Sequence, residues 1–389
     1  MKLSSLALVA LVFLATPVAA APPVARVSPV TDVYFGETVS DPYRWMEGGG
    51  AAFTDWAAAQ DAVTRSELST LPGYAALAGS VAAMSAAVEP VGWVSRVGDN
   101  IYYQRRPAGA QQNRLFVKSL KTGVEQELFD PTSGPGGALA SIAYYAPSPD
   151  GSLVAIGVAD SGSEEAVLRI LRVRDRTFLP DRIDRARFGS PSWDPDGRSF
   201  YYGRLRLTAP DADPATRFSD MRILRHRLGD DPDHDTQVFR IGDQSSDVGV
   251  DGATAITISN DGRYAFAIAN AGVSPFGEWW VTPVVDLRAG KPAWRKIGSL
   301  ADQLVQVSGS GNGIPPWVAG GKAIFLSTRD APRGKLVRVD LTRPDRPIET
   351  ILPEGETVLT QFIGAADGLY LLRTGEAVRV EEEAPIRLA

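Results

Sequence analysis

The feature that most constrains the fold is a short turn that recurs along most of the chain. Each copy pairs glycine with Asp, Asn or a second glycine and precedes an apolar run. The six copies start at Gly98, Ser148, Trp193, Ser259, Gly320 and Asp367. Glycine supplies the positive φ that a tight hairpin turn requires. The copies are roughly 50 residues apart, which is the repeat length of a four-stranded β-propeller blade.

Further apolar strands lie between these turns, for example at residues 115–117 and 167–171. Runs such as residues 154–156 show little polar alternation, which is typical of strands covered on both faces. An irregular β-sandwich is the alternative, but the regular recurrence favours a propeller. The sixth unit begins near Gln361 of a 389-residue sequence. We therefore expect a mainly β fold, an incomplete propeller of about five blades plus part of a sixth.

The region before the repeats is predicted to be helical. Phe53, Trp56 and Val63 recur at helical spacing, and after Pro72-Gly73 the same spacing holds for Leu77, Val81, Met84 and Val88. The pattern ends at Pro90. The expected division is a helical segment at residues 22–89 and a truncated propeller at residues 90–389.

Residues 1–21 have the pattern of a signal peptide. Lys2 precedes an apolar run over residues 3–14, and small residues at 19–21 offer a cleavage site. A membrane anchor is the alternative, but the run is shorter than the ~20 residues that a span needs. We expect an exported protein, periplasmic or secreted, with no membrane span after cleavage.

Composition narrows the possible chemistry. Lys and Arg total 40 and Asp and Glu total 46, a formal charge of −6 without a basic block, which argues against nucleic acid as a partner. The chain has no cysteine, so thiolate nucleophiles and Cys-ligated metals are excluded. Its two histidines, His226 and His234, leave few candidates for a catalytic base.

Several local patterns carry a family resemblance. The most specific is Tyr34-Phe35-Gly36 followed by Val39 and by Asp41-Pro42-Tyr43-Arg44-Trp45-Met46-Glu47. Matches continue through Tyr102-Tyr103, Gln112-Asn113, Leu128-Phe129-Asp130-Pro131, Ser148-Pro149-Asp150-Gly151, Ser161-Gly162-Ser163-Glu164, Phe188, Trp193 and His226-Arg227-Leu228-Gly229. From about Val33 to about Arg373, the chain resembles the prolyl oligopeptidases, which are serine peptidases.

The resemblance implies a seven-bladed type of propeller that caps an α/β-hydrolase domain. In that family the N-terminal segment packs on the hydrolase, and the propeller admits only short peptides. The hydrolase cleaves after proline with a Ser-Asp-His triad. The expected partners are therefore short peptides and a hydrolase domain.

No catalytic residue is assigned within this chain. A nucleophile elbow needs glycine two residues before and two residues after the serine. Ser199 and Ser274 have only the preceding glycine, and no other serine meets the pattern. We expect the chain alone to be inactive and to use neither cofactor nor metal. It could be a fragment of a longer gene product or a free-standing propeller that binds peptides or a protein; a peptidase acting through other residues is disfavoured.

Two residues are candidate substrate contacts, both by resemblance. Phe188 corresponds to a residue of the apolar wall near the bound peptide, with a core phenylalanine as the alternative. Glu164 lies in a loop that faces the hydrolase in the family, where it could touch substrate or the partner domain; a solvated charge is the alternative.

His226 and His234 could act as a base or as a metal pair. No carboxylate cluster accompanies them at metal-ligand spacing. We interpret Asp230, Asp231, Asp233 and Asp235 around His234 as an exposed acidic turn.

Overall fold

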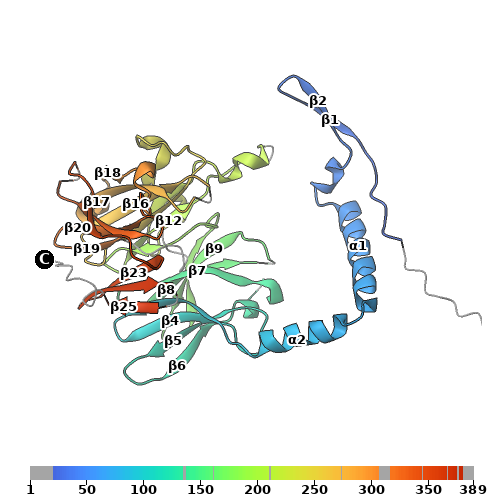
Figure 1. Ribbon diagram of the computed structural model, residues 1–389, viewed down its shortest axis with the longest axis horizontal. Coiled ribbons are helices and arrows are strands. Elements are labelled where there is room, and N and C mark those ends of the chain that lie inside the picture. Colours follow the sequence, from blue (N-terminus) through green and yellow to red (C-terminus); the bar gives the residue numbers. More distant parts are fainter. Residues whose placement is uncertain are drawn as a thin grey trace, which may run out of the picture. The chain divides into compact units, whose positions relative to one another are not determined.

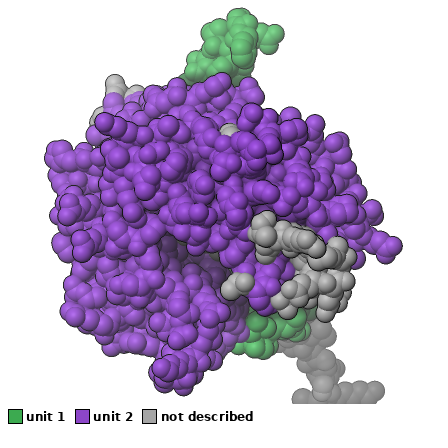
Figure 2. Space-filling model, turned by 90° about the vertical axis from the view of Figure 1, so that its left-hand side faces the viewer, with its two compact units in different colours: residues 1–88 green, residues 89–389 purple. Residues whose placement is uncertain are grey.

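The computed structural model describes residues 21–134, 137–160, 162–209, 212–272, 274–305, 316–343, 345–365, 367–374 and 376–379. The predicted signal peptide thus lies, except for Ala21, outside the described residues. Within the described chain, no helix is long and apolar enough to cross a membrane. The chain separates into two compact units, residues 1–88 and residues 89–389 (Figures 1 and 2).

Unit 1 holds a hairpin and two helices. The hairpin, which the sequence analysis did not anticipate, pairs β1 (Val30–Tyr34) with β2 (Glu37–Asp41) across a turn at Phe35-Gly36. The predicted helices are α1 (Ala51–Thr70) and α2 (Tyr74–Ala86), divided at Pro72-Gly73, where Gly73 has a φ of +84°.

Unit 1 has no buried residue among those described. On α1, the indole N–H of Trp56 donates to the carbonyl of Pro23 at 3.2 Å, and the Trp45 ring packs edge-on against the Trp56 ring. The apolar side chains of Leu77, Val81 and Met84 on α2 are 55–72% exposed. The apolar stripe of α2 is therefore uncovered within unit 1.

Unit 2 is a series of antiparallel sheets in chain order (Figure 1). Blade 1 comprises β3 (Val91–Val97), β4 (Asn100–Arg105), β5 (Arg114–Ser119) and β6 (Glu125–Phe129); blade 2 comprises β7 (Ser141–Pro147), β8 (Leu153–Ala159), β9 (Ala166–Arg172) and β10 (Thr177–Ile183). Blade 3 comprises β11 (Ser192–Trp193), β12 (Ser199–Arg204), β13 (Arg222–Arg227) and β14 (Thr236–Arg240); blade 4 comprises β15 (Ala253–Ile258), β16 (Tyr264–Asn270), β17 (Gly277–Pro283) and β18 (Arg295–Gly298). Blade 5 comprises β19 (Trp317–Ala319), β20 (Lys322–Ser327), β21 (Lys335–Asp340) and β22 (Glu349–Leu352); the last sheet has three described strands, β23 (Leu359–Ala365), β24 (Gly368–Arg373) and β25 (Glu376–Arg379). The predicted mainly β fold, about five blades plus part of a sixth, is confirmed.

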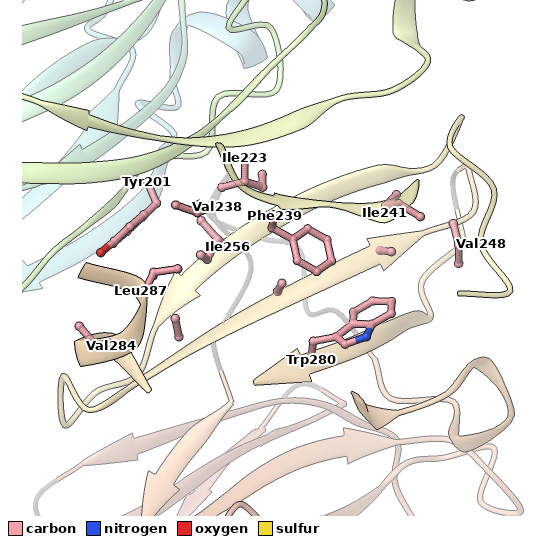
Figure 3. Close-up of a cluster of buried hydrophobic side chains, with 13 residues drawn as sticks. Tyr201, Ile223, Val238, Phe239, Ile241, Val248, Ile256, Trp280, Val284 and Leu287 are labelled. Atoms are coloured by element: carbon pink, nitrogen blue, oxygen red, sulfur yellow. The ribbon is translucent and has the colours of Figure 1, made fainter. Parts of the chain in front are cut away.

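The core lies between successive blades. Five buried apolar clusters join blades 1 to 2, 2 to 3, 3 to 4, 4 to 5, and 5 to the last sheet. Figure 3 shows the cluster between blades 3 and 4, where Phe239 packs against Trp280 with ring centroids 5.4 Å apart. The short helix α3 (Val284–Arg288) covers the same cluster with Val284 and Leu287. Burial on both faces explains why these strands lack polar alternation.

The last sheet packs on one face only in the described structure. Leu359, Phe362, Leu369 and Leu371 are buried against blade 5, whereas the opposite face exposes Ile363 and Leu372. Strand β23 begins at Leu359, two residues before the predicted start of the sixth unit. No buried apolar cluster of the described residues joins this sheet to blade 1.

The first strands of successive blades lie side by side: β3 contacts β7, β7 contacts β11, and β11 contacts β15. These strands therefore line the centre of the series, and each blade extends outward from its first strand. Figure 2 shows a recess near the middle of the face that unit 2 presents in that view.

Candidate functional site

Six side chains gather at the loops at one end of blades 2 and 3. The loop after β8 supplies Glu164 and Glu165, the segment before β11 supplies Arg187 and Phe188, and the loop after β12 supplies Arg217 and Phe218. The segment before β11 is fixed beside β12 because Gly203 N–H donates to the carbonyl of Gly189 at 2.8 Å. We call these six residues the rim cluster.

Two phenylalanines form the apolar part of the rim cluster. The Phe188 and Phe218 rings meet edge to face with centroids 6.1 Å apart, and the residues are 41% and 38% exposed. The Arg187 guanidinium lies 5.3 Å from the Phe188 centroid and 4.9 Å from the Phe218 centroid. Arg217 lies over Phe218 at 5.3 Å. Cation–π attraction favours these placements.

Two glutamates form ion pairs with the arginines of the rim cluster. Arg187 pairs with Glu164 and, at 3.5 Å, with Glu165, and Arg217 pairs with Glu165. The Glu164 side chain is 74% exposed, so its pair contributes little to stability.

The structure brings together the two residues that the sequence singled out. Phe188 is half-exposed rather than a core residue, and Glu164 shares the same cluster through Arg187. Sequence reasoning missed Arg187, Arg217, Phe218 and Glu165. A usable signal was present, because the dipeptide Arg-Phe occurs in the sequence only at 187–188 and 217–218. An exposed aromatic pair flanked by charges can bind an apolar side chain and orient a polar peptide backbone.

The histidines occupy two very different environments. His234 is 84% exposed and lies near Asp231, whereas the His226 side chain on β13 is fully buried. The His226 Nδ1–H donates to Asp235 at 3.0 Å, and the Nε2–H donates to Asp181 on β10 at 3.1 Å. The interpretation of Asp235 as part of an exposed acidic turn is wrong, because its side chain is only 3% exposed. The turn Pro232–His234 points it inward, and Tyr202 O–H donates to it at 2.7 Å.

This buried Asp181–His226–Asp235 group joins blade 2 to blade 3. Burial by itself lowers the pKa of His226, but hydrogen bonds to Asp181 and Asp235 outweigh it and raise that pKa to about 9. For Asp181 the signs are reversed: burial by itself raises the pKa of the carboxyl, but the hydrogen bonds from His226 and the Gly229 N–H lower that pKa overall. The group is an imidazolium clamped between two carboxylates at neutral pH. Both ring nitrogens are occupied, so neither is available to a substrate.

The described residues include no metal-binding arrangement of three or more His, Cys, Asp or Glu side chains. Within the described residues, both histidines pair with aspartates: His226 with Asp181 and Asp235, and His234 with Asp231. The expectation that this chain uses no cofactor stays a prediction.

The comparisons with known proteins agree with this architecture. Residues 22–379 match the family described as prolyl oligopeptidase, N-terminal β-propeller domain. Prolyl oligopeptidase A of Galerina marginata is 22% identical over 388 aligned residues, covering 90% of this chain and 50% of the relative. The prolyl endopeptidase of Elizabethkingia meningoseptica is 22% identical and covers 81% of this chain and 42% of the relative.

Solved structures show the same relationship. A structure from a study of two prolyl endopeptidases and their inter-domain dynamics superposes with a TM-score of 0.72 at 25% identity, over 90% of this chain and 49% of that one. Prolyl oligopeptidase B of Galerina marginata, bound to a 25-residue macrocyclization substrate, superposes with a TM-score of 0.69 at 18% identity. This chain spans about half the length of the relatives it matches.

Proposed function

The chain belongs to the prolyl oligopeptidase family through its N-terminal β-propeller domain, and from this premise we propose that unit 2 selects short proline-containing peptides for a serine peptidase. The rim cluster carries this proposal. Its half-exposed Phe188–Phe218 pair offers an apolar contact. Arg187 and Arg217 lie over these rings with side chains 24% and 47% exposed, and their guanidinium groups are hydrogen-bond donors for peptide carbonyls.

The proposal assigns the chemistry to a hydrolase domain and not to this chain. Within the described residues, His226 is sealed between two aspartates and His234 is exposed beside Asp231. In this part of the chain the side-chain partners of both histidines are aspartates and not a serine hydroxyl, the partner that a serine nucleophile requires of its base. In this proposal, serine-type cleavage of proline-containing peptides therefore requires that this chain be combined with a hydrolase domain.

Unit 1 supports a hydrolase-domain partner. The apolar residues Leu77, Val81, Met84 and Val88 are each 55–72% exposed. Apolar surface left in water costs about 25 cal/mol per Å². A domain that covers α2 would recover that free energy. The N-terminal pattern at residues 1–21 further supports export to the periplasm or the medium as the setting.

The test has a cleavage arm and a binding arm. The purified chain is assayed on a chromogenic glycyl-prolyl substrate, where we expect no turnover above a heat-denatured control. Binding of a short proline-containing peptide is measured by calorimetry, and Phe188→Ala should weaken it about tenfold. Phe35→Ala, which removes a fully exposed aromatic of unit 1, is the matched control and should bind normally. Equal binding by both variants would remove the rim cluster from the proposal.

A free-standing role as a peptide-binding or protein-binding propeller is the second candidate. The observation that favours it is that unit 2 has its own buried core between every pair of successive blades. A monomeric chain that unfolds cooperatively and binds peptide without a hydrolase would favour this role, whereas aggregation on expression would count against it.

A further inference from the structure

A cavity with a lining different from the rim cluster runs along the first strands of blades 1 to 4. It has a volume of about 300 Å³, at the lower end of the range of small-ligand sites. We call it the inner-strand pocket. Its ring-bearing lining residues are Trp93, Tyr145, Pro147, Pro149, Pro191 and Trp193.

The pocket begins at Ser190, two residues beyond Phe188, and extends toward the opposite end of the blades from the rim cluster. Pro149 belongs to the turn that precedes β8, whereas Glu164 follows the far end of that strand. Trp193 likewise ends β11 beside the turn that leads to β12, while Phe218 follows the end of β12. The inner-strand pocket and the rim cluster therefore have separate linings.

The lining determines what kind of ligand fits. Among the described residues that line it, none carries a charged side chain, so the lining offers no counter-ion to a charged ligand. Ser95 and Thr257 also line it, and their hydroxyls are groups that can donate to or accept from a peptide group. Aromatic-lined grooves are favourable docking sites for proline-rich segments, since the polyproline II conformation is already ordered before binding.

The backbone around the pocket is held in uncommon conformations. Trp93 has a φ of +53° and Ser190 a φ of +36°, and both line the cavity. At Trp93 the pairing of β3 with β4 also shifts register between Gly92 and Ser95, forming a bulge. Such strain concentrates at ligand sites, and bulges re-aim side chains.

We propose that the inner-strand pocket binds the ring of a proline within an uncharged stretch of peptide, through Trp93, Trp193 and Tyr145. The choice of a peptide rests on the proposed function, but the pocket and its lining do not. Proline selection would then occur at a second position along the centre of the blades, independently of the contact at Phe188.

The test follows the tryptophans directly. The full chain is labelled with 5-fluorotryptophan, and the resonances of Trp93 and Trp193 are assigned with the Trp93→Phe and Trp193→Phe variants. Acetyl-prolyl-prolinamide is the probe and acetyl-alanyl-alaninamide its control. We expect saturable shifts at Trp93 and Trp193 with the proline probe only, while the buried Trp279 and Trp280 stay unmoved.

A charged substitution tests the lining without removing a core ring. Val94 lines the pocket and is 57% exposed, so Val94→Asp should fold and should weaken probe binding about tenfold, because the carboxylate would lose water beside an apolar ring. Val124→Asp, at a 65% exposed turn of the same blade, is the matched control and should bind normally.

Two outcomes would overturn the inference. One is that neither tryptophan resonance responds up to the solubility limit of the probe, and the other is that the alanine control produces the same shifts. Phe188→Ala separates this inference from the proposed function. If the probe still binds to that variant and still shifts Trp93, the pocket is real whatever the role of the rim cluster; if binding vanishes with Phe188, the site lies at the rim and the inference fails.

Discussion

The buried Asp181–His226–Asp235 group should make the stability of unit 2 depend on pH through one residue. The folded-state pKa of His226 is raised to about 9 from an ordinary value of 6.5. A group whose pKa is raised on folding stabilises the fold fully below its unfolded pKa, and the stabilisation is lost as pH rises through the folded pKa. The relevant window therefore runs from about pH 6.5 to about pH 9.

The magnitude follows from the size of the shift. Each pKa unit corresponds to about 1.36 kcal/mol, so the shift of His226 corresponds to about 3 kcal/mol of unfolding free energy. The His226 side chain is fully buried and those of Asp181 and Asp235 are 1% and 3% exposed, so solvent does not screen the interaction. Tyr202 also faces the group, and its raised pKa keeps its hydroxyl protonated in this window.

The perturbation is His226→Asn, which leaves two buried carboxylates without their cation. Such a removal costs about 3–5 kcal/mol. Urea unfolding of the chain, repeated at pH 6 to 10, gives the unfolding free energy of both proteins. The gap between wild type and variant should be largest at pH 6 and should shrink by about 3 kcal/mol by pH 10, because the wild type loses its imidazolium.

The chain offers a matched control, since His234 is its other histidine and is 84% exposed. His234→Asn should change the unfolding free energy by less than about 0.5 kcal/mol at each pH. Nuclear magnetic resonance titration of the His226 ring gives its midpoint directly. A midpoint below pH 7, or a constant gap between wild type and His226→Asn from pH 6 to 10, would refute the reasoning.

Three further predictions concern packing and charge in the same unit, each checked by the urea midpoint against wild type. Gly157→Ala should destabilise by about 1–3 kcal/mol, because its Cβ would lie 2.3 Å from the Tyr144 ring; an unchanged midpoint would show that the ring can move. Arg288→Ala should cost about 3 kcal/mol by leaving the buried Asp194 without the guanidinium that contacts it at 2.9 Å, and a loss under about 1 kcal/mol would contradict this. Trp280→Ala should cost about 3–5 kcal/mol as a cavity opens between blades 3 and 4, unless the cluster collapses around it.

The strand pattern could be read from the sequence because a tight turn is a local event. Turns such as Ser148–Gly151 and Ser259–Gly262 close within a few residues, through hydrogen bonds from Gly151 N–H to Ser148 and from Gly262 N–H to Ser259. The hairpin at β1 and β2 was missed although Phe35-Gly36 marks its turn. Its strands have no buried face, so the hydrophobic alternation that identifies strands was weak there.

The candidate site was only half predictable. Phe188 and Glu164 were predicted from the family resemblance. Their connection depends on the ion pair between Arg187 and Glu164, two residues that are 23 positions apart along the chain. The buried Asp235 was misread because the local sequence is uniformly acidic and polar. Only the packing of blade 3 against blade 2 separates this carboxylate from the exposed Asp231 and Asp233.

The sequence by itself determined the repeat: where the blade turns fall, that about five blades and part of a sixth form, and that the inner blade strands lack polar alternation. These properties depend on backbone preferences and on the hydrophobic period, which act over a few residues. Only the tertiary structure decided which blades are joined by an ion pair, such as that of His226 in blade 3 with Asp181 in blade 2. It also decided which loops come into contact, such as those that carry Phe188 and Phe218. Such contacts depend on how one sheet packs against the next, and that packing brings together residues from sequence positions that no local pattern connects.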